Sequence, residues 1–150
     1  MDIKEFLAPS DVFIGIRGSN KTQLLEDLCR RAASTLKVDA DKITAGILKR
    51  EELGSTGMGG GVAIPHARIT DVKKPFGLLA RLKSAIEFDS IDRHPVDLVF
   101  LLLLPTASAG EQLNALAMVA RRLRDADTVR KARHAMDPSG LYAAMAQSST

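Results

Sequence analysis

Val96-Asp97-Leu98-Val99-Phe100-Leu101-Leu102-Leu103-Leu104 is the most strongly β-prone stretch of this 150-residue sequence. Its residues are apolar almost without interruption, which is typical of a strand that is buried on both faces of a sheet. Pro105 follows directly and ends the strand, because proline has no backbone N–H to donate. The stretch therefore predicts a central strand with helices packed on both sides of it.

The segments around this strand alternate between strand-like and helix-like patterns. Further extended segments are predicted at 12–16, 62–64, 76–82 and 86–92, the last of them ending in a turn. Helices are predicted from residue 20 to about 36, from 39 to about 53, over 111–124, over about 128–136 and from Asp137-Pro138 onward. Ser19, Asp39 and Asp137 are the predicted N-caps. The polar residues 147–150 are predicted to fray.

The helix predicted over 111–124 has one clearly apolar side. We expect that side, with Leu113, Leu116, Val119, Ala120 and Leu123, to pack on the sheet. No repeat, linker or low-complexity tract divides the chain. The sequence predicts an α/β fold: a single domain over residues 1–150, with a mixed β-sheet flanked by helices on both faces.

Composition excludes several classes of protein. Hydrophobic residues make up 45% and charged residues 26%, as is usual for a globular protein. Aromatic residues are only 4%, which argues against a protein that binds single-stranded nucleic acid by stacking bases. The net charge of +3 is small and its signs are interspersed, so no nucleic-acid partner is predicted.

Several features indicate the cytoplasm. The single cysteine, Cys29, lies on the apolar stripe of a predicted helix, which is typical of a buried thiol in a reducing compartment. The first residues do not form a signal peptide, and the longest apolar run, 98–104, is too short to span a membrane. We predict a cytoplasmic protein without membrane insertion.

One stretch, residues 50–68, departs from the pattern of ordinary folded elements. Five glycines lie within residues 54–61, and Pro65-His66 follows a short extended segment. Glycines allow unusual backbone conformations, and successive exposed N–H groups in such a turn form an anion site. Pro65 restricts the residue before it to an extended conformation, so His66 should project from a stiff strand end. A rigid imidazole beside backbone donors suits a phosphoryl acceptor, and Arg50 could reach the same loop.

The glycine-rich stretch also has other possible interpretations. A Walker loop would need Lys and then Ser or Thr after its last glycine, where Val62 and Ala63 stand. A dinucleotide fingerprint would join a strand to a helix, whereas this loop joins a helix to a strand. No metal-ligand spacing surrounds His66, and no nucleophile elbow is present, so neither a metal site nor a hydrolase triad is predicted. A structural loop without a ligand remains an alternative on composition alone. His94 and His134 are predicted to be structural or surface residues.

Residues 50–68, R-E-E-L-G-S-T-G-M-G-G-G-V-A-I-P-H-A-R, resemble the active-site signature of the mannitol/fructose-type IIA domains of the bacterial phosphotransferase system. A second block, 88–92 with 95–100, also resembles this family, and the order of elements matches over roughly residues 3–146. The resemblance implies the IIA mannitol/fructose-type fold. It also implies phosphorylation of His66, at the tele nitrogen, by a phospho-HPr-like carrier.

The same resemblance implies roles for other residues. Arg50 matches the arginine that helps to hold the phosphoryl group, and Ser55, Thr56 and Gly57 lie in the loop beside it. Family members often carry a second active-site histidine where this chain has Gln112, which can donate a hydrogen bond but cannot titrate. No cofactor, no metal and no independent turnover of a small molecule are expected.

Two branches of the family fit these features. The nitrogen-regulatory branch consists of free-standing domains that control target proteins through their phosphorylation state. The sugar-transport branch passes the phosphoryl group to a IIB domain. Gln112 makes efficient onward transfer more doubtful than acceptance, which favours the regulatory branch. From a different class, a module that binds an anion or nucleotide without covalent chemistry remains the alternative.

Overall fold

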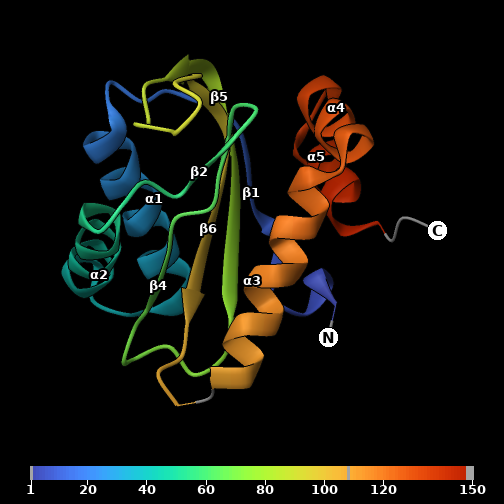
Figure 1. Ribbon diagram of the computed structural model, residues 1–150. Coiled ribbons are helices and arrows are strands. Elements are labelled where there is room, and N and C mark those ends of the chain that lie inside the picture. The colour runs from blue at the N-terminus through green and yellow to red at the C-terminus, as the bar shows by residue number, and fades with distance from the viewer. Residues whose placement is uncertain (1, 108, 148–150) are drawn as a thin grey trace.

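The computed structural model of the protein describes residues 2–107 and 109–147, apart from the side chains of Ala109, Glu111 and Gln112. Most of the tail predicted to fray, residues 148–150, lies outside this description. Within it, none of the helices is both long and apolar enough to cross a membrane. Figure 1 shows a sheet that stands between two groups of helices.

The sheet is mixed and six-stranded, with the order β1-β5-β6-β3-β2. Its strands are β1 (Leu7–Ile16), β2 (Gly57–Gly59), β3 (Val62–Ala63), β4 (His66–Arg68), β5 (Phe76–Ile86) and β6 (Val96–Leu104). β1 runs parallel to β5, and β5 runs antiparallel to β6. Both β3 and β4 pair with β6 in parallel, while β2 pairs antiparallel with β3. The bounds predicted for the central strand, 96–104, are confirmed.

Helices cover both faces of this sheet, as predicted (Figure 1). One face carries α1 (Lys21–Leu36) and α2 (Ala40–Glu52). The other carries α3 (Ala109–Arg124), α4 (Ala126–His134), α5 (Pro138–Ala146) and the short 3-10 helix η1 (Ile3–Glu5). Alternate residues of β6 divide between the two apolar cores: Val99 and Leu101 face one, and Leu98 and Phe100 face the other. This alternation explains why the strand is apolar on both sides.

Two strands are longer than their predicted segments. β1 begins at Leu7 instead of Val12 and includes Pro9. Proline is tolerated there because β1 is an edge strand and its register with β5 is interrupted between Leu7 and Val12. β5 continues to Ile86, through polar residues that its apolar pattern does not include.

The prediction of Ser19 as the first N-cap is wrong. The N-cap of α1 is Asn20, whose side-chain oxygen accepts a hydrogen bond from the Gln23 backbone N–H at 2.9 Å. Ser19 instead donates its backbone N–H to the Gln23 side chain at 2.9 Å. The other two predicted N-caps, Asp39 and Asp137, are confirmed.

The glycine-rich segment also contains regular structure that its composition did not predict. Gly57–Gly59 forms β2, which returns through a two-residue turn into β3. The turn residues Gly60 and Gly61 have φ values of 66° and 82°. Tight hairpins favour glycine because both turn positions need positive φ. The loop is therefore a hairpin packed on the sheet.

Gly77 provides a test of how closely the central strands pack. A Cβ atom at Gly77 would lie 2.7 Å from two carbons of the Phe100 ring, and that ring is fully buried. We expect Gly77→Ala to lower the free energy of unfolding by about 1–3 kcal/mol, because the ring cannot move aside without strain. Urea denaturation measures this change.

Gly110→Ala is the matched control, since none of the atoms that the structure describes lies within 4 Å of a Cβ atom built there. It should change the unfolding free energy by less than about 1 kcal/mol. Equal effects of the two substitutions would contradict the packing described for β5 and β6.

Candidate phosphoryl-acceptor site

A break in the strand that pairs with β6 sets the position of His66. β3 and β4 lie along the same edge of β6 and are separated only by Ile64 and Pro65. The Ile64 N–H donates to the Thr56 carbonyl at 3.1 Å, and the Pro65 carbonyl accepts from the Leu102 N–H at 2.9 Å. Proline has no N–H to leave unpaired at this break. His66 is thus the first residue of β4, rather than the last residue of a strand as predicted.

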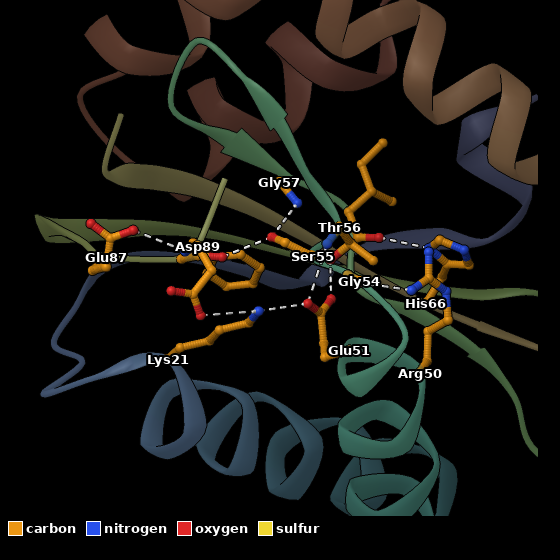
Figure 2. Close-up of polar contacts among 12 residues, drawn as sticks. Lys21, Arg50, Glu51, Gly54, Ser55, Thr56, Gly57, His66, Glu87 and Asp89 are labelled. Carbon is orange, nitrogen blue, oxygen red and sulfur yellow. Dashed lines mark hydrogen bonds and ion pairs between the residues drawn. The ribbon is translucent and has the colours of Figure 1, made fainter. Parts of the chain in front are cut away.

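The backbone at the break also orients the imidazole. Nδ1 of His66 lies 2.8 Å from the carbonyl oxygen of Ile64 (Figure 2). A carbonyl oxygen only accepts hydrogen bonds, so Nδ1 must carry the proton in the neutral ring. The lone pair then lies on Nε2, for which the described residues provide no hydrogen-bond partner. This tautomer has its nucleophilic nitrogen free.

The surroundings of His66 keep the imidazole neutral. Burial is the main cause that lowers the pKa of His66 from its ordinary value, and the charge of Arg50 lowers it further. The hydrogen bond to Ile64 and the charge of Glu51 act in the opposite direction but do not reverse the shift. At pH 7 the ring is therefore unprotonated at Nε2 and able to attack an electrophile.

Arg50, in the last turn of α2, lies beside the imidazole ring in Figure 2. Its Nη1 donates to the Gly54 carbonyl at 2.9 Å, which fixes the guanidinium over the glycine-rich loop. Arg50 and His66 both line an open pocket of about 490 Å³. Lys49 and Arg68 line the same pocket, so its charge suits an anion.

The other predicted loop residues lie near this site but make their hydrogen bonds within the protein. Ser55 Oγ donates to the Phe88 carbonyl at 2.7 Å and accepts the Gly57 N–H at 3.1 Å. Thr56 donates both its backbone N–H, at 3.2 Å, and its hydroxyl to the carboxylate of Glu51 (Figure 2). Gln112 belongs to α3, but its side chain lies outside the described residues.

The remaining candidates lie away from the pocket. His94 and His134 are exposed, as predicted. Cys29 is fully buried, and burial raises the pKa of its thiol to about 12, so the prediction of an inert thiol is confirmed. Among the side chains that the structure describes, no three His, Cys, Asp or Glu residues form a group able to hold a metal ion.

The sequence does not predict the role of several residues at the site. Ile64 contributes its backbone carbonyl, and every residue type has one, so the identity of residue 64 does not indicate this role. Of the residues predicted to face the sheet from α3, Val119 and Leu123 are buried, but Leu113 is 66% exposed beside the pocket. Leu53 is 83% exposed and lines the same pocket. The rim of the pocket is therefore both basic and apolar.

Comparisons with known proteins assign the chain to a family. The family model described as phosphoenolpyruvate-dependent sugar phosphotransferase system, EIIA 2, matches residues 5–148. The nitrogen regulatory protein of Bradyrhizobium diazoefficiens is 40% identical over 146 residues, which are 97% of this chain and 95% of that protein. Nitrogen regulatory protein IIA-Ntr from Neisseria meningitidis superimposes with a TM-score of 0.90 at 29% identity, over 95% of this chain and 98% of that one.

A mannitol IIA enzyme from Escherichia coli, solved in complex with its phosphorylated IIB enzyme, has a TM-score of 0.78 at 16% identity. The match covers 93% of this chain and 96% of that one, and at this identity it shows the fold alone. The predicted fold and the predicted resemblance to type-2 IIA domains are confirmed.

The state of His66 can be measured directly by long-range ¹H–¹⁵N NMR. We expect Nδ1 to be protonated and Nε2 unprotonated above neutral pH, because only Nδ1 faces the Ile64 carbonyl. On acidification the ring should take up its second proton at a pH below the ordinary histidine value of about 6.5, since burial disfavours the charged form. The same histidine in urea-unfolded protein is the reference. A folded midpoint at or above the unfolded one would contradict the site as described.

Proposed function

This chain belongs to the EIIA 2 family of the phosphoenolpyruvate-dependent sugar phosphotransferase system, and we propose that it carries a phosphoryl group on Nε2 of His66. In this proposal it is a cytoplasmic protein of the nitrogen-regulatory branch that controls its partners through its phosphorylation state. The observation that carries the proposal is the hydrogen bond from Nδ1 to Ile64, which leaves Nε2 free at a pocket lined by Arg50.

The proposed transfer balances without a cofactor. The Nε2 lone pair attacks phosphorus, an N–P bond forms, and the bond between phosphorus and the donor breaks with its electron pair leaving on the donor. The proton on Nδ1 stays in place, and the Ile64 carbonyl stabilises the positive charge that the ring gains. In this proposal Arg50, which lies beside the imidazole, offers charged N–H groups to the phosphoryl oxygens.

Ser55, Thr56 and Gly57 have a less direct role in this proposal. The Ser55 hydroxyl donates to Phe88, both donors of Thr56 to Glu51, and the Gly57 N–H to Ser55, so these residues shape the loop around the phosphoryl site. Gln112 is proposed as a further hydrogen-bond donor to the phosphoryl group, on the resemblance alone. No turnover of a small-molecule substrate is proposed.

The proposed donor is a protein, an HPr-like phosphocarrier. Leu53 and Leu113 are large apolar side chains left exposed next to the reactive histidine. Apolar residues inside a polar rim are typical of surfaces that bind other proteins. A free small donor would not need them. Targets that respond to the phosphorylation state would use the same rim.

The sugar-transport branch is the alternative within the family. The mannitol IIA enzyme that shares this fold was solved with a phosphorylated IIB enzyme, so the fold itself is compatible with transfer between IIA and IIB. The relative from Bradyrhizobium and the solved protein from Neisseria are both named as nitrogen regulatory proteins, and both match nearly the whole chain. These matches favour the regulatory branch.

Incubation with phosphoenolpyruvate, enzyme I and HPr, followed by intact mass spectrometry, tests the proposal. Wild type should gain the mass of one phosphoryl group, and His66→Ala should gain none, because His66 is the one histidine among the described residues that line the pocket. His134→Ala, which removes an exposed histidine, is the control and should be labelled like wild type.

No labelling of wild type, or full labelling of His66→Ala, would contradict the proposal. Addition of a IIB domain to the labelled protein separates the branches. Retention of the label is expected for a regulatory protein, and rapid loss would assign the chain to sugar transport.

Arg50→Gln tests the proposed ligand of the phosphoryl group. We expect the phosphorylation rate to fall by about 10²-fold, since one charged donor to the transferring group is lost. Arg50→Lys keeps the charge but not the planar fork and should recover only part of the rate. Stopped reactions analysed by mass spectrometry give both rates. A wild-type rate in Arg50→Gln would exclude this role.

A further inference from the structure

A series of polar contacts runs from the start of α1 to the ring of His66. It begins at Lys21, whose Nζ lies 2.8 Å from Oε2 of Glu51 at the end of α2. The side chains of this pair are only 17% and 6% exposed. Removing two charges from water costs free energy unless they are paired. This pair therefore differs from an exposed surface ion pair, and loss of one partner would leave the other charge buried and unpaired.

Glu51 connects this ion pair to the glycine-rich loop. Its carboxylate accepts both the backbone N–H and the hydroxyl of Thr56, a residue that is itself buried. The Thr56 carbonyl then accepts the Ile64 N–H at 3.1 Å. The Ile64 carbonyl accepts Nδ1–H of His66 at 2.8 Å. Two residues therefore link the Glu51 carboxylate to the imidazole.

Phe88 holds the ion pair from the other side. Lys21 Nζ lies 4.6 Å from the centroid of the buried Phe88 ring, within the range of a cation–π contact. The carbonyl of Phe88 accepts the Ser55 hydroxyl, so the segment between β5 and β6 contacts both Lys21 and the loop. Figure 2 shows Lys21, Glu51 and Thr56 between α1, α2 and the loop. The ammonium group of Lys21 is thus held by Glu51 and by the Phe88 ring rather than extending into solvent.

We propose that Lys21 and Glu51 are positioning residues, which hold Thr56 and Ile64 so that the Ile64 carbonyl keeps Nδ1 of His66 protonated and Nε2 free. Neither residue lines the pocket, so they act through the loop and not by contact with the phosphoryl group. The kinetic consequence of this role rests on the proposed function. The structural consequence, the tautomer of His66, does not.

The charge of Lys21 has a second effect in this arrangement. A phosphoryl group that approaches His66 is anionic, and an unbalanced carboxylate at Glu51 would repel it. Lys21 balances that carboxylate. Burial is the main cause that lowers the pKa of His66, and the charges of Arg50 and Glu51 act on it in opposite directions. Lys49 and Arg68 face the same pocket and are unchanged in the variants below.

The test uses the full chain with Lys21→Met, Glu51→Gln, the double variant and Lys21→Arg. Lys42→Met is the matched control, since it breaks an exposed ion pair of the same kind between Lys42 and Asp71 at 3.1 Å. The first measurement is the tautomer of His66 by long-range ¹H–¹⁵N NMR. We expect Lys21→Met and Glu51→Gln to give a mixture of Nδ1–H and Nε2–H forms, and Lys21→Arg and Lys42→Met to keep Nδ1–H.

The second measurement is the rate of phosphorylation at several concentrations of phosphorylated HPr. For Lys21→Met we expect kcat to fall roughly tenfold or more, with KM unchanged, because the histidine is misplaced while the docking surface is intact. The double variant should be faster than Lys21→Met, because it also removes the unbalanced carboxylate. Lys42→Met should keep both constants.

The outcomes separate this inference from the proposed function. An unchanged tautomer and unchanged kcat in folded Lys21→Met and Glu51→Gln would overturn the inference, with phosphorylation of wild type still standing. If wild type is not phosphorylated, the proposed function fails and the tautomer alone decides the inference. If Lys21→Met does not fold, as circular dichroism would show, Glu51→Gln and the double variant decide it. If Lys42→Met lowered kcat as much as Lys21→Met does, the effect would not be specific to Lys21, and the inference would also be overturned.

Discussion

The interruption of the strand at Ile64 and Pro65 is the constraint on which the site depends. On either side of it, β3 and β4 continue the parallel pairing with β6, so the backbone on both sides is fixed by the sheet. Within it, the Ile64 N–H turns to the loop and the Ile64 carbonyl turns to His66. The carbonyl toward β6 is that of Pro65, so the Ile64 carbonyl is left to pair with Nδ1 of His66.

Around this fixed histidine the protein combines two kinds of surface. The pocket itself is basic, through Lys49, Arg50 and Arg68, while Leu53 and Leu113 are exposed at its rim. A phosphoryl group would add up to about two negative charges to this basic pocket. On this account, a partner that docks on the apolar rim meets a different charge in each state. Acceptance of phosphate and regulation of partners would then use one surface.

Much of the fold follows from residue patterns, because burial imposes them. The apolar run of β6 predicts its bounds and its central place, and Asp39 and Asp137 mark helix starts by their capping chemistry. Residue patterns do not predict the structure where a contact between distant parts of the chain determines it. Gly57–Gly59 is a strand only because it pairs with β3, and Leu113 is exposed because α3 turns other residues to the sheet. At the site, a signature marks His66 and Arg50, but neither the Ile64 carbonyl nor the distant Lys21 leaves a signal in the sequence.

The central claim, a phosphoryl group on Nε2 of His66 with Nδ1–H held by Ile64, is tested most directly by NMR of the phosphorylated protein labelled with ¹⁵N. The account predicts coupling of phosphorus to Nε2 of His66, with Nδ1 still protonated and hydrogen-bonded near neutral pH. Phosphorus coupled to Nδ1, or attached to a residue other than His66, would contradict it.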